Sequence, residues 1–398
     1  MARTVRVLGV GDPAVYAYTD EDLDILGQWR RDGGGEVSFE IVPWDRYLST
    51  LSVQFEAGEP SCDIIMLPGH LWLPEFVEAG RLAPLGTYVA GMPSADWDDF
   101  KPFVRDELRY RDEYYLMPSF TDGHVVFYRS DLVVGAGGGA ARGDGGAAPV
   151  AGGPATALTT PVVLGEMAKR SDGAGHRGIA LKADPSEIFL DWLPYLWAFG
   201  GDLLSSDGRP VFASRAGVES LEFYRALREV APPDTDRYGN EQIAEALRDG
   251  RVAMATSWGG QAGFIYASNG GFRGDLTVAT FERPWNVVWS FGVLASSPDV
   301  SAAFEFLRYL SGPEVDAKVG RYAGSPVRSS TYAAGRETIP WYPVQEDMLD
   351  RASRLPRHPR MNAILPAVTE KLVACFSGDL PAREALGQAA TAVEAVLA

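Results

Sequence analysis

The segment VRVLGVGDP, residues 5–13, opens the chain with a short apolar run that stops at a Gly-Asp-Pro turn signal. We interpret Val5–Val10 as a buried strand, because apolar runs of this length bounded by Gly and Pro are typical of parallel sheets. A helical pattern follows over residues 19–31, with Thr19 as its N-cap. A second strand is predicted over residues 36–42. Strands that alternate with helices predict an α/β fold.

The same alternation continues through the first half of the chain. The patterns predict a helix over residues 44–57, a buried strand over 62–67 and a short helix over 73–79. Residues 114–129 are apolar and bent in the middle, and we interpret them as the first passage from one lobe to another. Two lobes are expected because 398 residues exceed the size at which a single core keeps growing.

The second half of the chain is predicted to be mostly helical. Helices are predicted over residues 186–199, 216–230, 241–249, 300–310 and 381–397, and short strands over 252–256, 276–280 and 293–295. Residues 135–155 are rich in Gly, Ala and Pro, a composition that builds no packed core. We therefore predict a flexible surface loop there.

Composition narrows the classes of partner. The formal net charge of −17 repels nucleic acid and anionic membrane surfaces, so neither is expected as a partner. No apolar stretch is long enough to cross a bilayer. The first residues resemble a strand and carry Arg6, which is atypical of a signal peptide. Either an export signal has been removed, or the protein is cytoplasmic.

No motif for catalysis or metal binding stands out. The histidines show no metal-ligand spacing, and Cys62 and Cys375 are expected to be buried free thiols. A nucleophile elbow and a phosphate-binding loop are both missing. We therefore expect no metal, no cofactor and no enzymatic activity.

Ten tryptophans are present, and most of them lie beside turn signals. Aromatic rings at the ends of elements suit a ligand with apolar faces and a hydroxylated rim, which describes a sugar. The alternative is that each ring only closes a large core. For the set as a whole we favour a binding cleft.

Several segments, in order, resemble the solute-binding proteins of carbohydrate ABC importers, the maltose-binding-protein type. They cover nearly the whole chain: DIIM at 63–66, AGRLAPL at 79–85, Pro118 with Asp122 and YRSDL at 128–132, GGDLL at 200–204, GRVAM at 250–254 with Trp258, AFEFLRYLSGPE at 303–314, and GSPVR at 324–328. The ordered set is specific for this family but not for one sugar.

The resemblance implies a two-lobe, type II periplasmic-binding-protein-like fold with a hinge between the lobes and a ligand cleft at their interface. The lobes are expected at residues 1–118 with 280–311, and at 119–279 with 312–398. The implied ligand is a sugar or oligosaccharide, and the implied partners are the membrane subunits of an ABC importer. We expect a monomer attached to the cell surface, provided that an export signal was removed.

Most candidate ligand-binding residues lie at strand ends or match the family's loops, whereas Glu187, Asp191 and Trp192 lie in the helix predicted over 186–199, where the spacing of four puts Glu187 and Asp191 on one face. The candidates are Asp12, Trp44, His70, Trp72, Phe120, Asp122, Glu187, Asp191, Trp192, Trp258, Gln261, Trp289, Ser290 and Arg328. Trp258 ranks first, and Trp289, expected in the last inter-lobe loop, ranks second. Several have structural alternatives: Asp12 as a helix cap, Asp122 as a hinge residue, and Arg328 as a cap of residues 324–327, which we favour.

Two other functions stay open, because a fold does not determine a function. One is a cytoplasmic enzyme or carrier on the same two-lobe scaffold, in which Cys62 or Asp122 would be the group to suspect. The other is a closing sensor that reports the ligand to a partner protein.

Overall fold

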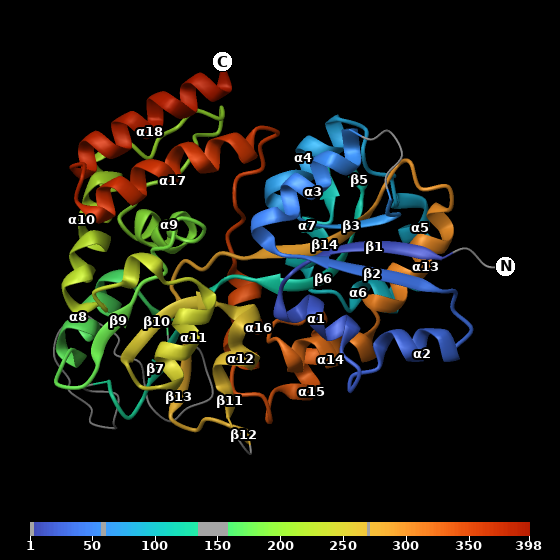
Figure 1. Cartoon of the computed structure of the whole chain (residues 1–398), viewed down its shortest axis with the longest axis horizontal. Coiled ribbons are helices and arrows are strands. Elements are labelled where there is room, and N and C mark those ends of the chain that lie inside the picture. The colour runs from blue at the N-terminus through green and yellow to red at the C-terminus, as the bar shows by residue number, and fades with distance from the viewer. Residues whose placement is uncertain (1–3, 57–60, 134–157, 269–270) are drawn as a thin grey trace. The chain divides into compact units, whose positions relative to one another are not determined.

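The structure is a computed structural model that describes residues 4–56, 61–133, 158–268 and 271–398 (Figure 1). The predicted flexible loop at 135–155 lies outside these ranges. The chain divides into two compact units, Met1–Asp122 with Val287–Ile339, and Gly123–Asn286 with Pro340–Ala398. The boundary at Asp122 lies inside the segment that we interpreted as the first passage. Residues 312–339 belong to the first unit, whereas the prediction placed them in the second.

The first unit is built on a five-stranded sheet in the order β2-β1-β3-β14-β6. β1 pairs in parallel with β2 and β3, and β14 is antiparallel to both β3 and β6. The strands are β1 (Val5–Val10), β2 (Val37–Val42), β3 (Ile64–Pro68), β6 (Leu116–Asp122) and β14 (Val287–Val293). A two-stranded ribbon, β4 (Arg109–Tyr110) and β5 (Glu113–Tyr114), lies outside this sheet.

Helices cover this sheet, with α3 and α4 on one side and α1 and α14 on the other (Figure 1). The helices are α1 (Pro13–Thr19), α2 (Ile25–Arg31), α3 (Trp44–Glu56), α4 (Gly69–Glu78), α5 (Gly86–Ala90), α6 (Ser94–Asp98), α7 (Pro102–Glu107), α13 (Val300–Leu310), α14 (Pro313–Tyr322) and α15 (Ser329–Gly335). α14 contacts α1 and β6, which explains why residues 312–339 belong to this unit.

The second unit contains a sheet in the order β8-β13-β7-β10-β9. β10 is parallel to β9 and antiparallel to β7. The strands are β7 (His124–Arg129), β8 (Leu158–Thr159), β9 (Arg177–Ala180), β10 (Val252–Trp258) and β13 (Leu276–Phe281), with a separate ribbon of β11 (Ala267–Ser268) and β12 (Gly271–Phe272).

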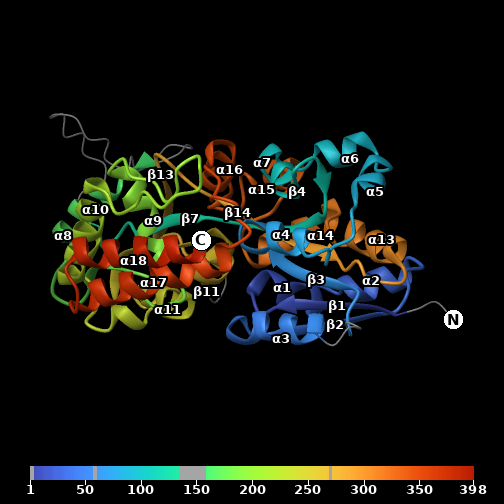
Figure 2. The same ribbon diagram turned by 90° about the horizontal axis from the view of Figure 1, so that it is seen from above.

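The helices of the second unit include a layer in which α17 packs against α18 and α9 (Figure 2). They are α8 (Pro161–Ser171), α9 (Ile188–Ala198), α10 (Arg215–Ala226), α11 (Asn240–Arg248), α12 (Ala262–Tyr266), α16 (Tyr342–Arg351), α17 (Met361–Ser377) and α18 (Ala382–Leu397), with 3-10 turns η1 (Leu227–Val230), η2 (Thr235–Arg237) and η3 (Gly259–Gln261). Among the described residues, none of the helices is long and apolar enough to cross a membrane.

Most predicted elements are confirmed, and two predictions are wrong. The helix predicted over 19–31 is two helices, because Asp12 rather than Thr19 caps α1 and the chain turns at Asp24, whose φ is 50°. The second wrong prediction concerns residues 287–293, where we expected a loop around Trp289 and a strand that begins only at residue 293. These residues form β14. It is buried almost throughout, so its sequence lacks the alternation of apolar and polar residues that is typical of a strand with one solvent-exposed face.

Candidate functional site

Four predicted residues form one aromatic cluster in the first unit. Trp44 follows β2, Trp72 lies in α4 just after β3, Phe120 is near the end of β6, and Trp289 pairs with Pro68 across β14 and β3. The ring centroids of Trp44 and Trp72 lie 5.7 Å apart, those of Trp44 and Trp289 5.6 Å, and those of Phe120 and Trp289 6.0 Å. The carboxyl ends of β2, β3 and β6 and the beginning of the antiparallel β14 bring these residues together, at the edge where open α/β sheets bind ligands.

The four rings of this cluster differ in exposure. Trp72 and Phe120 are buried and support the others, whereas Trp289 is half-buried and 41% of Trp44 is exposed. Tyr16 on α1, also exposed, lies nearby: its hydroxyl and Pro43, the neighbour of Trp44, both lie close to Gly11. Trp44 is therefore the ring of this cluster best placed to stack against a ligand.

The remaining polar candidates of the first unit surround this edge of the sheet. Asp12 caps α1, with its Oδ1 accepting a hydrogen bond of 2.8 Å from the amide of Ala14. His70 lies in the first turn of α4, and Asp122 is the last residue of β6; both are buried. Ser290 is buried beside a bulge in β14, and its hydroxyl has no hydrogen-bond partner among the described residues.

The second unit brings Trp258 and Glu187 together. Trp258 ends β10, and Glu187 precedes α9 in the connection that follows β9. Because β9 and β10 are parallel, both residues lie at the same edge of the second unit's sheet. The indole Nε1–H of Trp258 donates a hydrogen bond of 2.8 Å to Oε2 of Glu187. Because this donor is occupied, a ligand can contact only the part of the Trp258 ring that stays accessible, and 9% of the residue is exposed. The side chain of Glu187 is 13% exposed.

Sequence reasoning missed Lys182 and His124, which complete this cluster. Nζ of Lys182 lies 2.8 Å from Oε2 of Glu187 and 4.9 Å from the ring centroid of Trp258. The ring of His124 lies 4.6 Å from that of Trp258 and 5.1 Å from that of Trp285. Burial, together with the charge of Lys182, holds the pKa of His124 well below its usual range, so the imidazole is neutral. His124 lies within the predicted segment 114–129, next to the bend at Gly123, whereas Lys182 follows β9, a strand that we did not predict.

Asp191 and Trp192 are corrections to the prediction. Both side chains are fully buried in the second unit. Asp191 accepts hydrogen bonds from the hydroxyl groups of Thr256 and Tyr224, and burial raises the pKa of its carboxyl. The indole of Trp192 donates to Ser220. The helical spacing that suggested a polar face instead places these two residues in the core.

The assignment of Arg328 to ligand binding is a third correction. Its role is structural, as we favoured, but its contacts differ from the expected cap of residues 324–327. Its guanidinium is buried over the ring of Phe100, at 4.0 Å from the centroid. It forms ion pairs with Asp96 at 2.7 Å and with Asp99 at 3.0 Å, and its Nε donates to the carbonyl of Ser311. Arg328 therefore joins α6 to the loop before α14 and is not exposed to a ligand.

The profile of the family described as bacterial extracellular solute-binding protein matches residues 14–317, which is most of the chain. The chain belongs to this family. This solute-binding protein is 24% identical over 233 residues to a putative binding protein of Brucella abortus, a match that covers 56% of the chain and 50% of the relative. The chain thus spans about half the length of that relative.

Two further proteins are similar to this solute-binding protein. A mannitol-binding protein of Pseudomonas aeruginosa is 25% identical over 320 residues, covering 74% of the chain and 67% of the relative. A maltose-bound protein of T. maritima has the same fold, with a TM-score of 0.83, 20% identity and 99% of each chain covered. The two-lobe α/β fold predicted from sequence is therefore confirmed.

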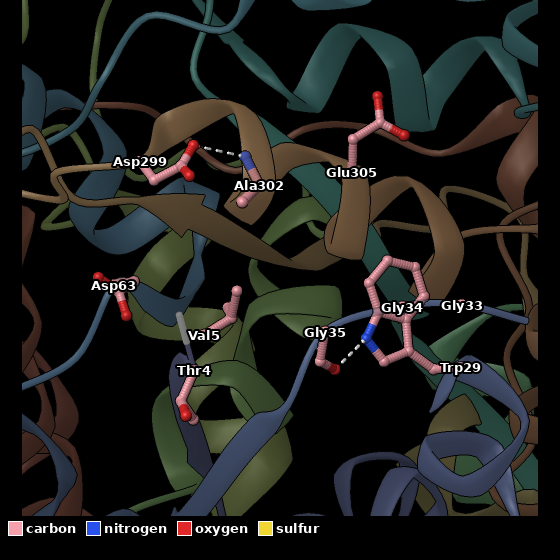
Figure 3. Close-up of a pocket in the computed structure, with 10 residues that line it drawn as sticks. All are labelled: Thr4, Val5, Trp29, Gly33, Gly34, Gly35, Asp63, Asp299, Ala302 and Glu305. Atoms are coloured by element: carbon pink, nitrogen blue, oxygen red, sulfur yellow. Dashed lines mark hydrogen bonds between the residues drawn. The ribbon is translucent and has the colours of Figure 1, made fainter. Parts of the chain in front are cut away.

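The solute-binding protein also has a pocket of about 320 Å³ at the opposite end of the first unit's sheet, where β1 begins (Figure 3). Trp29 forms one wall, and its indole donates to the carbonyl of Gly35. Two of the three acidic groups of this pocket have internal roles, since Asp63 pairs with Arg6 and Asp299 caps α13, and the third, Glu305, forms an exposed ion pair with Arg308. Among the described residues, no group of three or more acidic, His or Cys side chains could hold a metal ion.

Proposed function

We propose that this solute-binding protein binds a neutral sugar or polyol without transforming it and delivers it to the membrane subunits of an ABC importer. The observation that carries the proposal is the pairing of an indole ring with a partly exposed carboxylate, at Trp258 and Glu187. The C–H faces of a sugar or polyol stack on such a ring, while its hydroxyl groups donate to the carboxylate.

The first unit supports the same chemistry. Trp44 offers an exposed ring backed by Trp72, which holds it in place through stacking at 5.7 Å. Asp122 and Asp12 place carboxylates at the ends of β6 and β1, at the same edge of the sheet. We propose that the Trp44 surface of the first unit also contacts a ligand.

Relatives support this choice of ligand class. One relative is named a mannitol-binding protein, and one structure of the same fold contains maltose. We further propose that the protein acts outside the cytoplasmic membrane as a monomer, in keeping with the extracellular description of its family.

The test is calorimetric titration with a panel of polyols and sugars that includes D-mannitol and maltose. Saturable binding, with the ligand recovered unchanged by chromatography, is the expected result. Trp258→Ala should weaken binding of the best ligand, whereas Trp29→Phe, at the far end of the first unit's sheet, should not. Turnover of the ligand, or no binding anywhere in the panel, would refute the proposal.

A further inference from the structure

A fully buried lysine lies against the candidate ligand surface of the second unit. Lys182 has no exposed side-chain surface, although Lys is among the residue types least often buried. We propose that Lys182 makes this surface selective for neutral ligands and against cationic ones. The inference rests on the proposed function, because it concerns how the same surface chooses among sugars and polyols.

The contacts of Lys182 define its role. Its ammonium group forms an ion pair of 2.8 Å with Oε2 of Glu187, the oxygen that also accepts the indole N–H of Trp258. The same ammonium lies 4.9 Å from the centroid of the Trp258 ring, within the range of a cation–π interaction. One cation therefore contacts both groups that we assign to ligand binding in this unit.

Without this cation, the surface would attract amines. An indole face and a carboxylate are the two groups that recognise an ammonium ion in proteins, one through its quadrupole and the other through its charge. Trp258 and Glu187 together would favour an amino sugar or an amino alditol over a neutral one. Lys182 neutralises the carboxylate and already interacts with the ring, so a second cation nearby is repelled.

The other ionisable groups nearby do not replace Lys182. His124, which contacts Trp258, is neutral because burial lowers the pKa of its imidazole. Asp191 lies 3.7 Å from Nδ1 of His124, and its oxygens accept hydrogen bonds from Thr256, Tyr224 and the backbone amide of Lys182. Lys182 is thus the only cation among the groups named here that contact Trp258 or Glu187.

A purely structural lysine would give a different result from a selective one. If Lys182 only held Glu187 in place, its removal would weaken all ligands alike. If it sets selectivity, its removal changes the ratio of affinities for a neutral ligand and its amino analogue. The ratio is therefore the informative measurement.

The experiment measures the affinities of D-mannitol and 1-amino-1-deoxy-D-mannitol, and of D-glucose and D-glucosamine, by calorimetry at pH 7 and moderate salt. Lys182→Met should shift the ratio towards the amine by roughly five- to tenfold, the size expected for a cation–π and charge contact. Glu187→Gln should shift it the other way, since it leaves Lys182 uncompensated. The double variant should return the ratio towards the wild-type value.

The matched control is Lys169→Met, which removes a lysine from an exposed ion pair with Glu166 in the same unit. It should leave both affinities unchanged. Thermal unfolding identifies any variant that does not fold, and if Lys182→Met fails, the opposite shift in Glu187→Gln decides the question. Equal losses for both members of each pair, or ratios that do not move, would overturn the inference. A wild-type protein that binds none of the four compounds and nothing in the wider panel would instead refute the proposed function.

Discussion

Asp316 allows a prediction whose size follows from the structure. This carboxyl is buried in the first unit, where it accepts hydrogen bonds from the amides of Val327 and Arg328 and from the hydroxyl of Thr331. Burial is the largest influence on it and exceeds the effect of these donors, so that the pKa of Asp316 rises from 3.8 to about 6. The folded protein therefore holds a proton on this group at pH values where the unfolded chain does not.

The sign of the effect follows from this difference. Between about pH 6 and pH 4 the folded state binds more protons at Asp316 than the unfolded state does, so the stability contribution of this group rises as pH falls. A pKa change from 3.8 to about 6 corresponds to roughly 3 kcal/mol when the whole interval is crossed. Above pH 6 the contribution is absent.

The measurement is urea unfolding of the wild type and Asp316→Asn at several pH values between 4 and 7. Other carboxyl groups also titrate in this range, so the difference between the two proteins is the quantity to follow. The wild type should gain about 2 kcal/mol over the variant as the pH falls from 7 to 4.

Asp99→Asn provides the control with the opposite sign. Burial acts to raise the pKa of Asp99, but hydrogen bonds from Ser330 and Arg328 outweigh it and lower the pKa overall. The stability that this group contributes is present above its unfolded pKa and is lost as pH falls through the lower, folded one. If the difference between wild type and Asp316→Asn does not change with pH, the reasoning about Asp316 is wrong.

Three further changes test the site and its support. Trp44→Ala should weaken ligand binding by roughly tenfold while the melting temperature of the free protein stays nearly constant, because a large part of the ring is already exposed; calorimetry and thermal scans measure both, and a large loss of stability would contradict the assignment. Arg328→Met should lower the free energy of unfolding by about 3 kcal/mol, since it leaves Asp96 and Asp99 without their cation; a loss below about 1 kcal/mol in urea would show that solvent compensates the pair. Gly123→Ala should lower the melting temperature, because a Cβ there would lie 2.4 Å from the carbonyl oxygen of Trp285; an unchanged melting temperature would mean that this backbone relaxes easily.

The sequence pattern predicted helices and strands well where apolar residues recur at a regular spacing. The helix at Val300–Leu310 has apolar residues on one face, and its predicted bounds equal the observed ones. β14 was missed because a strand buried on both sides shows no alternation, and because Trp289 precedes a serine and was interpreted as a loop residue. Sequence spacing also placed Asp191 beside Glu187 on one helix face, whereas Glu187 lies just before α9 and only Asp191 is within it.

The sequence alone determined the fold class, the family resemblance and the set of aromatic residues from which a binding surface is built. It did so because apolar periodicity and turn residues are local properties, and because the family's segments occur in a fixed order. The tertiary structure alone decided which side chains share a surface. Lys182 contacts Trp258 across 76 residues of sequence, and Arg328 contacts Asp96 across 232. Such contacts depend on strand order and packing, and no spacing along the chain encodes the depth at which a charged side chain is buried.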